Sequence, residues 1–129
     1  MAGKEVIRTD RAPGPFQGAP YNQAIRLGDL VFVAGQLGVS LETGELVGPG
    51  IEEQTDQALR NLGAILEAAG SSLDKLLKTT IFLVDLADFP KMNEVYARHV
   101  GDRPPARSTI GTAQLPAGAR VEIEAIAHV

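Results

Sequence analysis

Cysteine is absent from this chain of 129 residues, and its absence excludes a group of chemistries. Without thiols there is no disulfide, no thiolate nucleophile and no cysteine-ligated metal site. The histidines, His99 and His128, have no metal-ligand spacing around them, so each is interpreted as a surface residue. The serines lack the G-x-S-x-G context of a nucleophile elbow, and the glycines form neither a P-loop nor a dinucleotide-binding fingerprint. We therefore predict no metal site, and any reaction must proceed without a cofactor or a nucleophile of these kinds.

Long basic runs and long apolar runs are also missing. The net charge is −4, and no stretch has the clustered lysines and arginines of a phosphate-binding surface, so no nucleic-acid partner is expected. The apolar runs are too short to cross a bilayer, and the opening residues MAGKEVIRTD lack the apolar core of a signal peptide. We expect a cytoplasmic protein that does not associate with membranes.

The chain suits a single domain over residues 1–129 with strands and helices in the order β-β-β-α-β-α-β-β. Apolar residues recur at helical spacing over 51–70, and a second helix is predicted over 88–101, with Asp88 as its N-cap and Gly101 as its end. Gly28-Asp29 is typical of a tight hairpin between two strands. Strands are predicted over 5–13, 23–27, 30–36, 75–86, 106–113 and 119–129.

The number of helices predicts an oligomer. Two helices of this length can cover only one face of a six-stranded sheet. Yet LVFVAG and TTIFLVD carry apolar residues on both faces, and residues 75–86 are interpreted as a strand buried on both sides. A second copy of the chain is the simplest cover for the remaining face.

Charged residues in the last two strands are the candidate functional groups. Glu122 alternates with apolar residues expected to lie under the helices, and Arg107 shares a strand face with Thr109. If that face also bears Glu122, a guanidinium and a carboxylate meet in an apolar subunit junction. The two could form an interfacial ion pair. Alternatively, the planar guanidinium of Arg107 binds an anion through two parallel hydrogen bonds, and Glu122 holds a water molecule.

Other polar residues allow two interpretations each. Tyr21 follows a Pro- and Gly-rich loop and is either a packed aromatic or a binding residue. Asn93 is either an exposed helix residue or part of a site. Gly35, in VAGQ, indicates a bulge or a close backbone approach.

Several segments, in this order, resemble the reactive intermediate deaminase family, RidA, formerly called YjgF. They are APYNQAI, LVFVAGQLGV, TGEL, KTTIFLVDLADFPKMNEVY, PPARSTI and LPAGARVEIEAIA, which together run from about Tyr21 to His128. The resemblance implies a chorismate-mutase-like α+β fold with a six-stranded mixed sheet, two helices on one face, and a homotrimer around the other. It also implies hydrolysis of 2-imino acids or their enamine tautomers, such as 2-iminobutanoate and 2-iminopropanoate, to 2-keto acids and ammonia, without a cofactor.

The resemblance also implies roles for individual residues in clefts between subunits. Arg107, in PARS, would bind the substrate carboxylate, and Glu122, the first glutamate of VEIE, would position the attacking water. The remaining matches to positions that line the cleft or contact the ligand are Tyr21, Gly35, Asn93 and Thr109.

Two departures from the family pattern concern substrate breadth. Ala34 stands where many relatives have serine, and GAPYNQA, after PGPFQ, replaces the usual IGPYSQA. Two rival functions belong to other classes. One is a non-catalytic module that binds small carboxylates or acts as a chaperone. The other is a ribonuclease or translation inhibitor, which the acidic balance and the low aromatic content of 5% disfavour.

Overall fold

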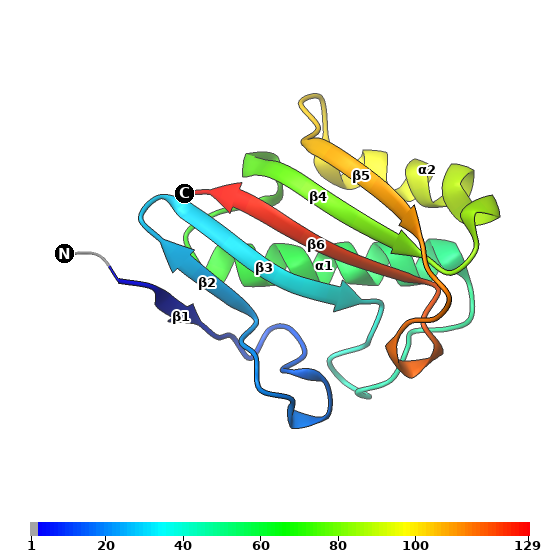
Figure 1. Cartoon of the computed structure of the whole chain (residues 1–129), viewed down its shortest axis with the longest axis horizontal. Coiled ribbons are helices and arrows are strands. Elements are labelled where there is room, and N and C mark those ends of the chain that lie inside the picture. Colours follow the sequence, from blue (N-terminus) through cyan, green and yellow to red (C-terminus); the bar gives the residue numbers. More distant parts are fainter. Residues whose placement is uncertain (1–2) are drawn as a thin grey trace.

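The computed structural model describes residues 3–129 as one six-stranded sheet with two α-helices packed on one of its faces (Figure 1). The elements appear in the predicted order. The strands are β1 (Glu5–Ile7), β2 (Ala24–Leu27), β3 (Leu30–Leu37), β4 (Leu76–Leu83), β5 (Ala106–Gly111) and β6 (Val121–His128), and the helices are α1 (Ile51–Ala68) and α2 (Phe89–Val100). The predicted α+β fold with a mixed sheet and both helices on one face is confirmed. Among residues 3–129, no helix combines the length and the apolar character needed to cross a bilayer.

The sheet is mixed because of one parallel pair. Its strands lie in the order β1-β2-β3-β6-β4-β5. β4 and β5 are parallel, with α2 as the connection between them, whereas every other neighbouring pair is antiparallel. β2 and β3 form the predicted hairpin through Gly28, whose φ of 59° is the left-handed conformation that such a turn requires. Because β5 is last in the strand order, it is an edge strand, and part of its backbone is unpaired within the sheet.

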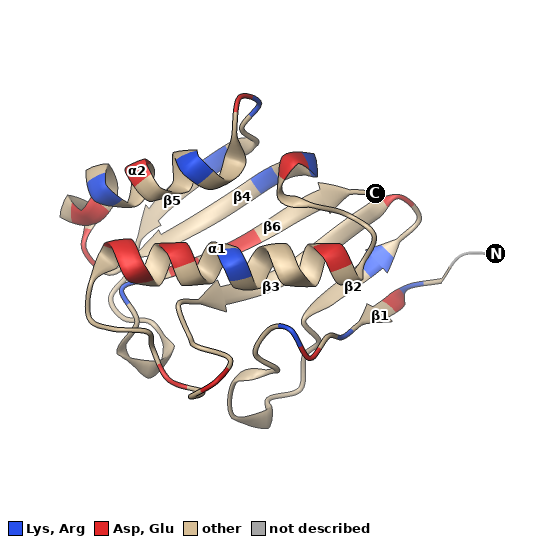
Figure 2. Ribbon diagram, turned by 180° about the vertical axis from the view of Figure 1, so that it is seen from behind, with Lys and Arg blue, Asp and Glu red and all other residues tan. Residues whose placement is uncertain are grey.

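The hydrophobic core lies between the sheet and the two helices. In β6, the alternate residues from Val121 to Ala127 are buried, as predicted for the face under the helices. The residues that meet them from α1 recur at helical spacing and include Leu59, Leu62 and Leu66, which are fully buried. The outer sides of both helices carry charged residues and face away from the sheet (Figure 2).

The opposite face of the sheet is not covered by any of the described residues. Phe32 of β3 is exposed, and Phe82 of β4 is only half-buried. The prediction that residues 75–86 are buried on both faces is therefore wrong for one protomer, in which β4 is buried on one face only. The first strand is also shorter than the predicted 5–13, because the chain from Arg8 onward leaves the sheet and forms a loop.

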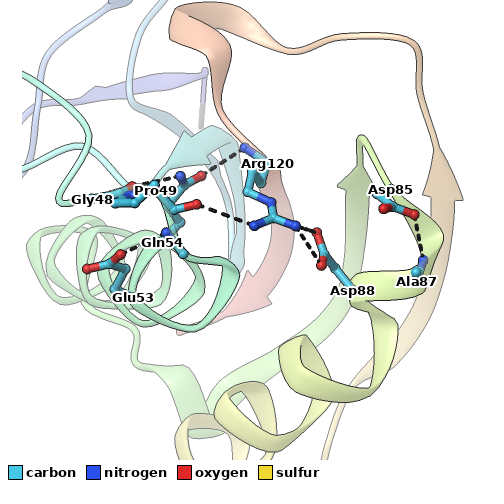
Figure 3. Close-up of polar contacts among 9 residues, drawn as sticks. Gly48, Pro49, Glu53, Gln54, Asp85, Ala87, Asp88 and Arg120 are labelled. Carbon is cyan, nitrogen blue, oxygen red and sulfur yellow. Dashed lines mark hydrogen bonds and ion pairs between the residues drawn. The ribbon is translucent and has the colours of Figure 1, made fainter.

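A polar network ties the start of β6 to both helices (Figure 3). Arg120 donates from Nη2 to both carboxylate oxygens of Asp88 at 2.8 Å. Its backbone N–H donates to Oε1 of the buried Gln54, also at 2.8 Å, and Nε2 of Gln54 donates to the carbonyl of Gly48 at 2.8 Å. The network joins the strand that bears Glu122 to the first turn of α1 and to the residue that precedes α2.

Asp88 does not cap α2 in the way that was predicted. It occupies the N-cap position, but its carboxylate accepts no hydrogen bond from the backbone of the helix. The carboxylate pairs with Arg120 instead, and Asp85 accepts from the backbone N–H of Ala87 at 2.9 Å. Because the ion pair takes both carboxylate oxygens of Asp88, the chain uses Asp85 as the local cap.

We expect Gln54→Ala to lower the free energy of unfolding by about 1–3 kcal/mol, because it leaves the backbone N–H of Arg120 and the carbonyl of Gly48 without their partner. Denaturant unfolding at a fixed protein concentration measures the loss. Gln114→Ala removes an exposed glutamine and should stay within about 0.5 kcal/mol of the wild type. Equal stability of the two variants would show that the contacts of Gln54 do not hold this part of the fold together.

Candidate functional site

Glu122 and Gly35 are in direct contact where β3 departs from regular pairing with β6. The register of the two strands shifts between Val33 and Gln36, which is the bulge predicted from Gly35. A Cβ atom placed on Gly35 would lie 2.8 Å from Cδ of Glu122. Because Gly35 has no side chain, the carboxylate of Glu122 can occupy this space. Any larger residue at position 35 would displace the carboxylate.

Glu122 lines a cavity of about 740 Å³ at one end of the sheet. Tyr21 and Gly35 line the same cavity, so the structure brings three of the six predicted site residues together. The hydroxyl oxygen of Tyr21 accepts a hydrogen bond from the backbone N–H of Phe16 at 2.6 Å, which fixes the ring at the wall. We call Tyr21, Gly35 and Glu122 the glutamate half-site.

The carboxylate of Glu122 is in an environment that favours its protonated form. Burial, the larger cause, and the charge of Glu124 both raise the pKa of Glu122 above its ordinary value. No hydrogen bond or ion pair joins this carboxylate to another residue within the described part of the chain. A carboxyl group in this state can exchange a proton with a molecule in the cavity.

Arg107 lies between two aromatic rings of α2. Its guanidinium carbon is 5.3 Å from the centroid of Phe89 and 5.0 Å from that of Tyr96. The rings hold the cation by cation–π attraction. Among residues 3–129, Arg107 forms no ion pair with a carboxylate.

Asn93 and Thr109 belong to the same region. Phe89, Asn93 and Tyr96 recur at helical spacing on one side of α2. Oδ1 of Asn93 is buried and has no hydrogen-bond partner in residues 3–129. Thr109 shares the strand face of Arg107 on β5. We call Asn93, Arg107 and Thr109, with the two rings, the arginine half-site.

The two half-sites lie on opposite faces of the sheet within one protomer. Arg107 is paired in register with Thr79, which is buried under the helices, whereas Glu122 is paired with Phe82 on the uncovered face. The condition considered from the sequence, a shared face for Arg107 and Glu122, therefore does not hold inside a single chain. A contact between these two residues requires two copies.

The aromatic residues around Arg107, Phe89 and Tyr96, were not among the site residues predicted from the sequence. Tyr96 is buried between the second helix and the sheet, with its hydroxyl 2.7 Å from Oγ1 of Thr79. Burial, the largest cause, raises the pKa of Tyr96. The spacing of seven residues between the two aromatic residues was the available signal, but only the parallel pairing of β4 and β5 brings Arg107 to them.

No group of three or more histidine, aspartate or glutamate residues suited to a metal ion occurs within residues 3–129. His99 is engaged elsewhere, since its Nε2 lies 2.8 Å from Oδ1 of Asp56 and links the two helices. The half-sites thus offer one guanidinium, one carboxyl group, two phenols, one threonine hydroxyl and an amide oxygen that has no partner within residues 3–129.

Comparison with known proteins gives consistent results along nearly the whole chain. The family model described as Endoribonuclease L-PSP matches residues 11–129. A RutC family protein from Pyrococcus horikoshii is 50% identical over 125 residues, which cover 97% of this chain and 98% of that protein. The 2-iminobutanoate/2-iminopropanoate deaminase of Homo sapiens is 41% identical over 124 residues, covering 96% of this chain and 89% of the human one. A crystal structure of RidA from an Antarctic Psychrobacter superposes with a TM-score of 0.92 at 41% identity, covering 97% of this chain and 99% of that one.

The raised pKa of Glu122 predicts how the stability of the protein depends on pH. Between the ordinary value of 4.5 and the raised value, the folded state binds more protons than the unfolded state, so the free energy of unfolding falls as pH rises. Near neutral pH, the ionised carboxylate therefore destabilises the fold. We expect Glu122→Gln to have a higher Tm than the wild type near neutral pH, and the difference to shrink as pH falls from the raised pKa toward 4.5.

Differential scanning calorimetry across this pH range measures the effect. Glu124→Gln is the matched control, because it removes only the smaller cause of the shift and should raise Tm less. A lower Tm for Glu122→Gln near neutral pH would mean that a cation pairs with this carboxylate in the assembled protein.

Proposed function

The chain belongs to the reactive intermediate deaminase (RidA/YjgF) family, whose model carries the description Endoribonuclease L-PSP, and on this premise we propose that it hydrolyses 2-imino acids to 2-keto acids and ammonia. Relatives at 40–43% identity are named 2-iminobutanoate/2-iminopropanoate deaminase. An Arabidopsis relative at 48% identity is named Reactive Intermediate Deaminase A, chloroplastic. These names support the reaction class, and the structural argument concerns how the residues of this chain would perform it.

The observation that carries the proposal is the Arg107 guanidinium, held by two rings and unpaired with any carboxylate among residues 3–129. A planar guanidinium binds a carboxylate through two parallel hydrogen bonds. Every 2-imino acid carries such a carboxylate next to the reacting carbon. Arg107 would therefore bind the substrate and fix the position of its imine group.

Glu122 would act on the water molecule. In the proposed reaction, water adds to the imine carbon, and its oxygen becomes the keto oxygen. The carbon–nitrogen bond breaks with both electrons going to nitrogen, which receives the two protons of the water and leaves as ammonia. A carboxyl group with a raised pKa is suited to accepting one of these protons and returning it.

Two copies of the chain are needed for this arrangement, since Arg107 and Glu122 of one protomer lie on opposite faces of the sheet. We propose a homotrimer in which the arginine half-site of one copy meets the glutamate half-site of its neighbour. The uncovered face of the sheet, with the exposed Phe32, supports such an assembly because it offers apolar surface to a second copy. The remaining residues would line the cleft, with Tyr21 and Gly35 on one side and Asn93 and Thr109 on the other.

The proposal predicts that Arg107→Ala lowers kcat/KM for 2-iminobutanoate by about a hundredfold, because the substrate carboxylate loses its charged partner. Arg107→Lys keeps the positive charge but cannot form two parallel hydrogen bonds to a carboxylate, so it should retain intermediate activity. Arg98→Ala, an exposed arginine of α2, is the control and should match the wild type. The assay generates the imine in situ with an amino-acid oxidase and follows release of ammonia and keto acid.

Undiminished ammonia release by Arg107→Ala would overturn the proposal. Binding of 2-oxobutanoate by the wild type without any acceleration of imine hydrolysis would favour a carboxylate-binding module. RNA cleavage that disappears in Arg107→Ala and in Glu122→Gln, in preparations without imine hydrolysis, would favour the ribonuclease.

A further inference from the structure

The cavity of the glutamate half-site extends well beyond Glu122 between two loops. One loop precedes β2 and contributes Pro15 and Phe16, and the other follows β3 and contributes Val39 and Leu41. Both loops lie at the same end of the sheet (Figure 1). The wall that they form is mainly apolar, whereas Glu122, the only group of this cavity to which a proton transfer is assigned, lies beside the bulge.

The first loop is held in place by Gln23, which is buried. Its Nε2 donates to the backbone carbonyls of Thr9 and Ala12 at 3.1 Å and of Pro13 at 2.9 Å. Its Oε1 accepts from the backbone N–H of Thr9 at 2.7 Å. The amide group of Gln23 thus bonds both N–H and carbonyl groups of the loop backbone. The loop is therefore held in one conformation before a ligand binds.

Phe16 is positioned by the same loop at the cavity. Its backbone N–H is the donor to Tyr21, and the next residue, Gln17, has a φ of 53°, which turns the chain sharply at this point. The Phe16 side chain is 37% exposed, although it is aromatic. An aromatic ring on a fixed loop, open to a cavity, offers apolar contact to a ligand at little cost in conformational entropy.

Leu41 lies on the other loop and is 48% exposed. The loop is closed by hydrogen bonds from the backbone N–H of Ser40 to the carbonyl of Glu45 at 2.8 Å and from the N–H of Gly44 to the carbonyl of Ser40 at 2.9 Å. A bridge between Val39 and Leu46 also closes this loop. Leu41 is therefore a second exposed apolar side chain at a defined place in the same cavity.

We propose that Phe16 and Leu41 form a pocket for the substrate side chain and select 2-imino acids with branched or aromatic side chains. The proposal rests on the proposed function, in which Arg107 and Glu122 act on the groups that all 2-imino acids share. A cavity of about 740 Å³ is within the size range of sites for drug-sized ligands. The methyl group of 2-iminopropanoate would leave most of its apolar wall in contact with water, whereas an isobutyl or benzyl group would cover it.

Three variants test the pocket. Phe16→Ala and Leu41→Ala remove its walls, and Leu27→Ala removes a leucine of similar exposure, 50%, at the end of β2, where it pairs with Leu30 next to the β2–β3 turn. The imines are generated from alanine, leucine and phenylalanine, and the quantity compared is kcat/KM for each bulky imine divided by that for the alanine-derived imine. Calorimetric binding of 4-methyl-2-oxopentanoate and of pyruvate gives the same ratio without catalysis, and gel filtration reports the assembly of each variant.

We expect the wild type to prefer the leucine- and phenylalanine-derived imines, and each pocket variant to lower this preference roughly tenfold. Leu27→Ala should keep the wild-type ratio. A wild type that prefers the alanine-derived imine, or pocket variants that keep the ratio, would overturn the pocket while leaving the deaminase function in place.

Two other outcomes are also informative. Loss of assembly in Phe16→Ala and Leu41→Ala, with unchanged ratios in the remaining oligomer, would show that a neighbouring copy occupies the cavity, and would overturn the pocket. Wild-type protein that hydrolyses none of the imines, or Arg107→Ala protein that hydrolyses all of them at the wild-type rate, would overturn the proposed function and the pocket with it.

Discussion

The Arg107 guanidinium is partly removed from water between the rings of Phe89 and Tyr96 and has no carboxylate partner within residues 3–129. Removing a charge from water is costly, and aromatic faces repay only part of that cost. In the proposed function, the carboxylate of the substrate supplies the partner that this cation lacks among the described residues. Asn93 adds a buried amide oxygen that has no hydrogen-bond partner among the described residues, so the arginine half-site offers both a charge and a hydrogen-bond acceptor.

The sheet lies between Arg107 and Glu122 of one protomer, so the proposed site requires a second copy of the chain. β4 places Thr79 under the helices beside Arg107 and Phe82 on the uncovered face beside Glu122. One protomer thus contributes to two different clefts in the proposed trimer. The ion pair between Arg120 and Asp88 connects these contributions, because Arg120 lies two residues before Glu122 and Asp88 immediately precedes Phe89. The hydrogen bonds of Arg120 thus join the strand that carries Glu122 to the turn that precedes Phe89.

Much of the fold could be predicted from local patterns. Helical spacing located α1, signals at the helix ends located α2, Gly28-Asp29 located the hairpin, and the small number of helices indicated one uncovered face. The pairing of strands could not be predicted in this way, because it depends on contacts between distant segments. The face of Arg107 followed from the parallel register of β4 and β5, in which Thr79 is its partner. Phe16 and Leu41 were not identified as site residues because loop residues have no periodicity, and only the folded chain brings their loops to one cavity.

The account depends most directly on a site shared between copies of the chain, and mixed oligomers test this. Arg107→Ala and Glu122→Ala are each expected to retain only about a hundredth of the wild-type activity when expressed alone. When the two variants are co-expressed in equal amounts, about a quarter of the clefts in randomly assembled rings receive a wild-type arginine from one copy and a wild-type glutamate from its neighbour. The account predicts recovery of about a quarter of the wild-type rate of imine hydrolysis. Mixed oligomers that stay as inactive as the two parent variants would contradict it.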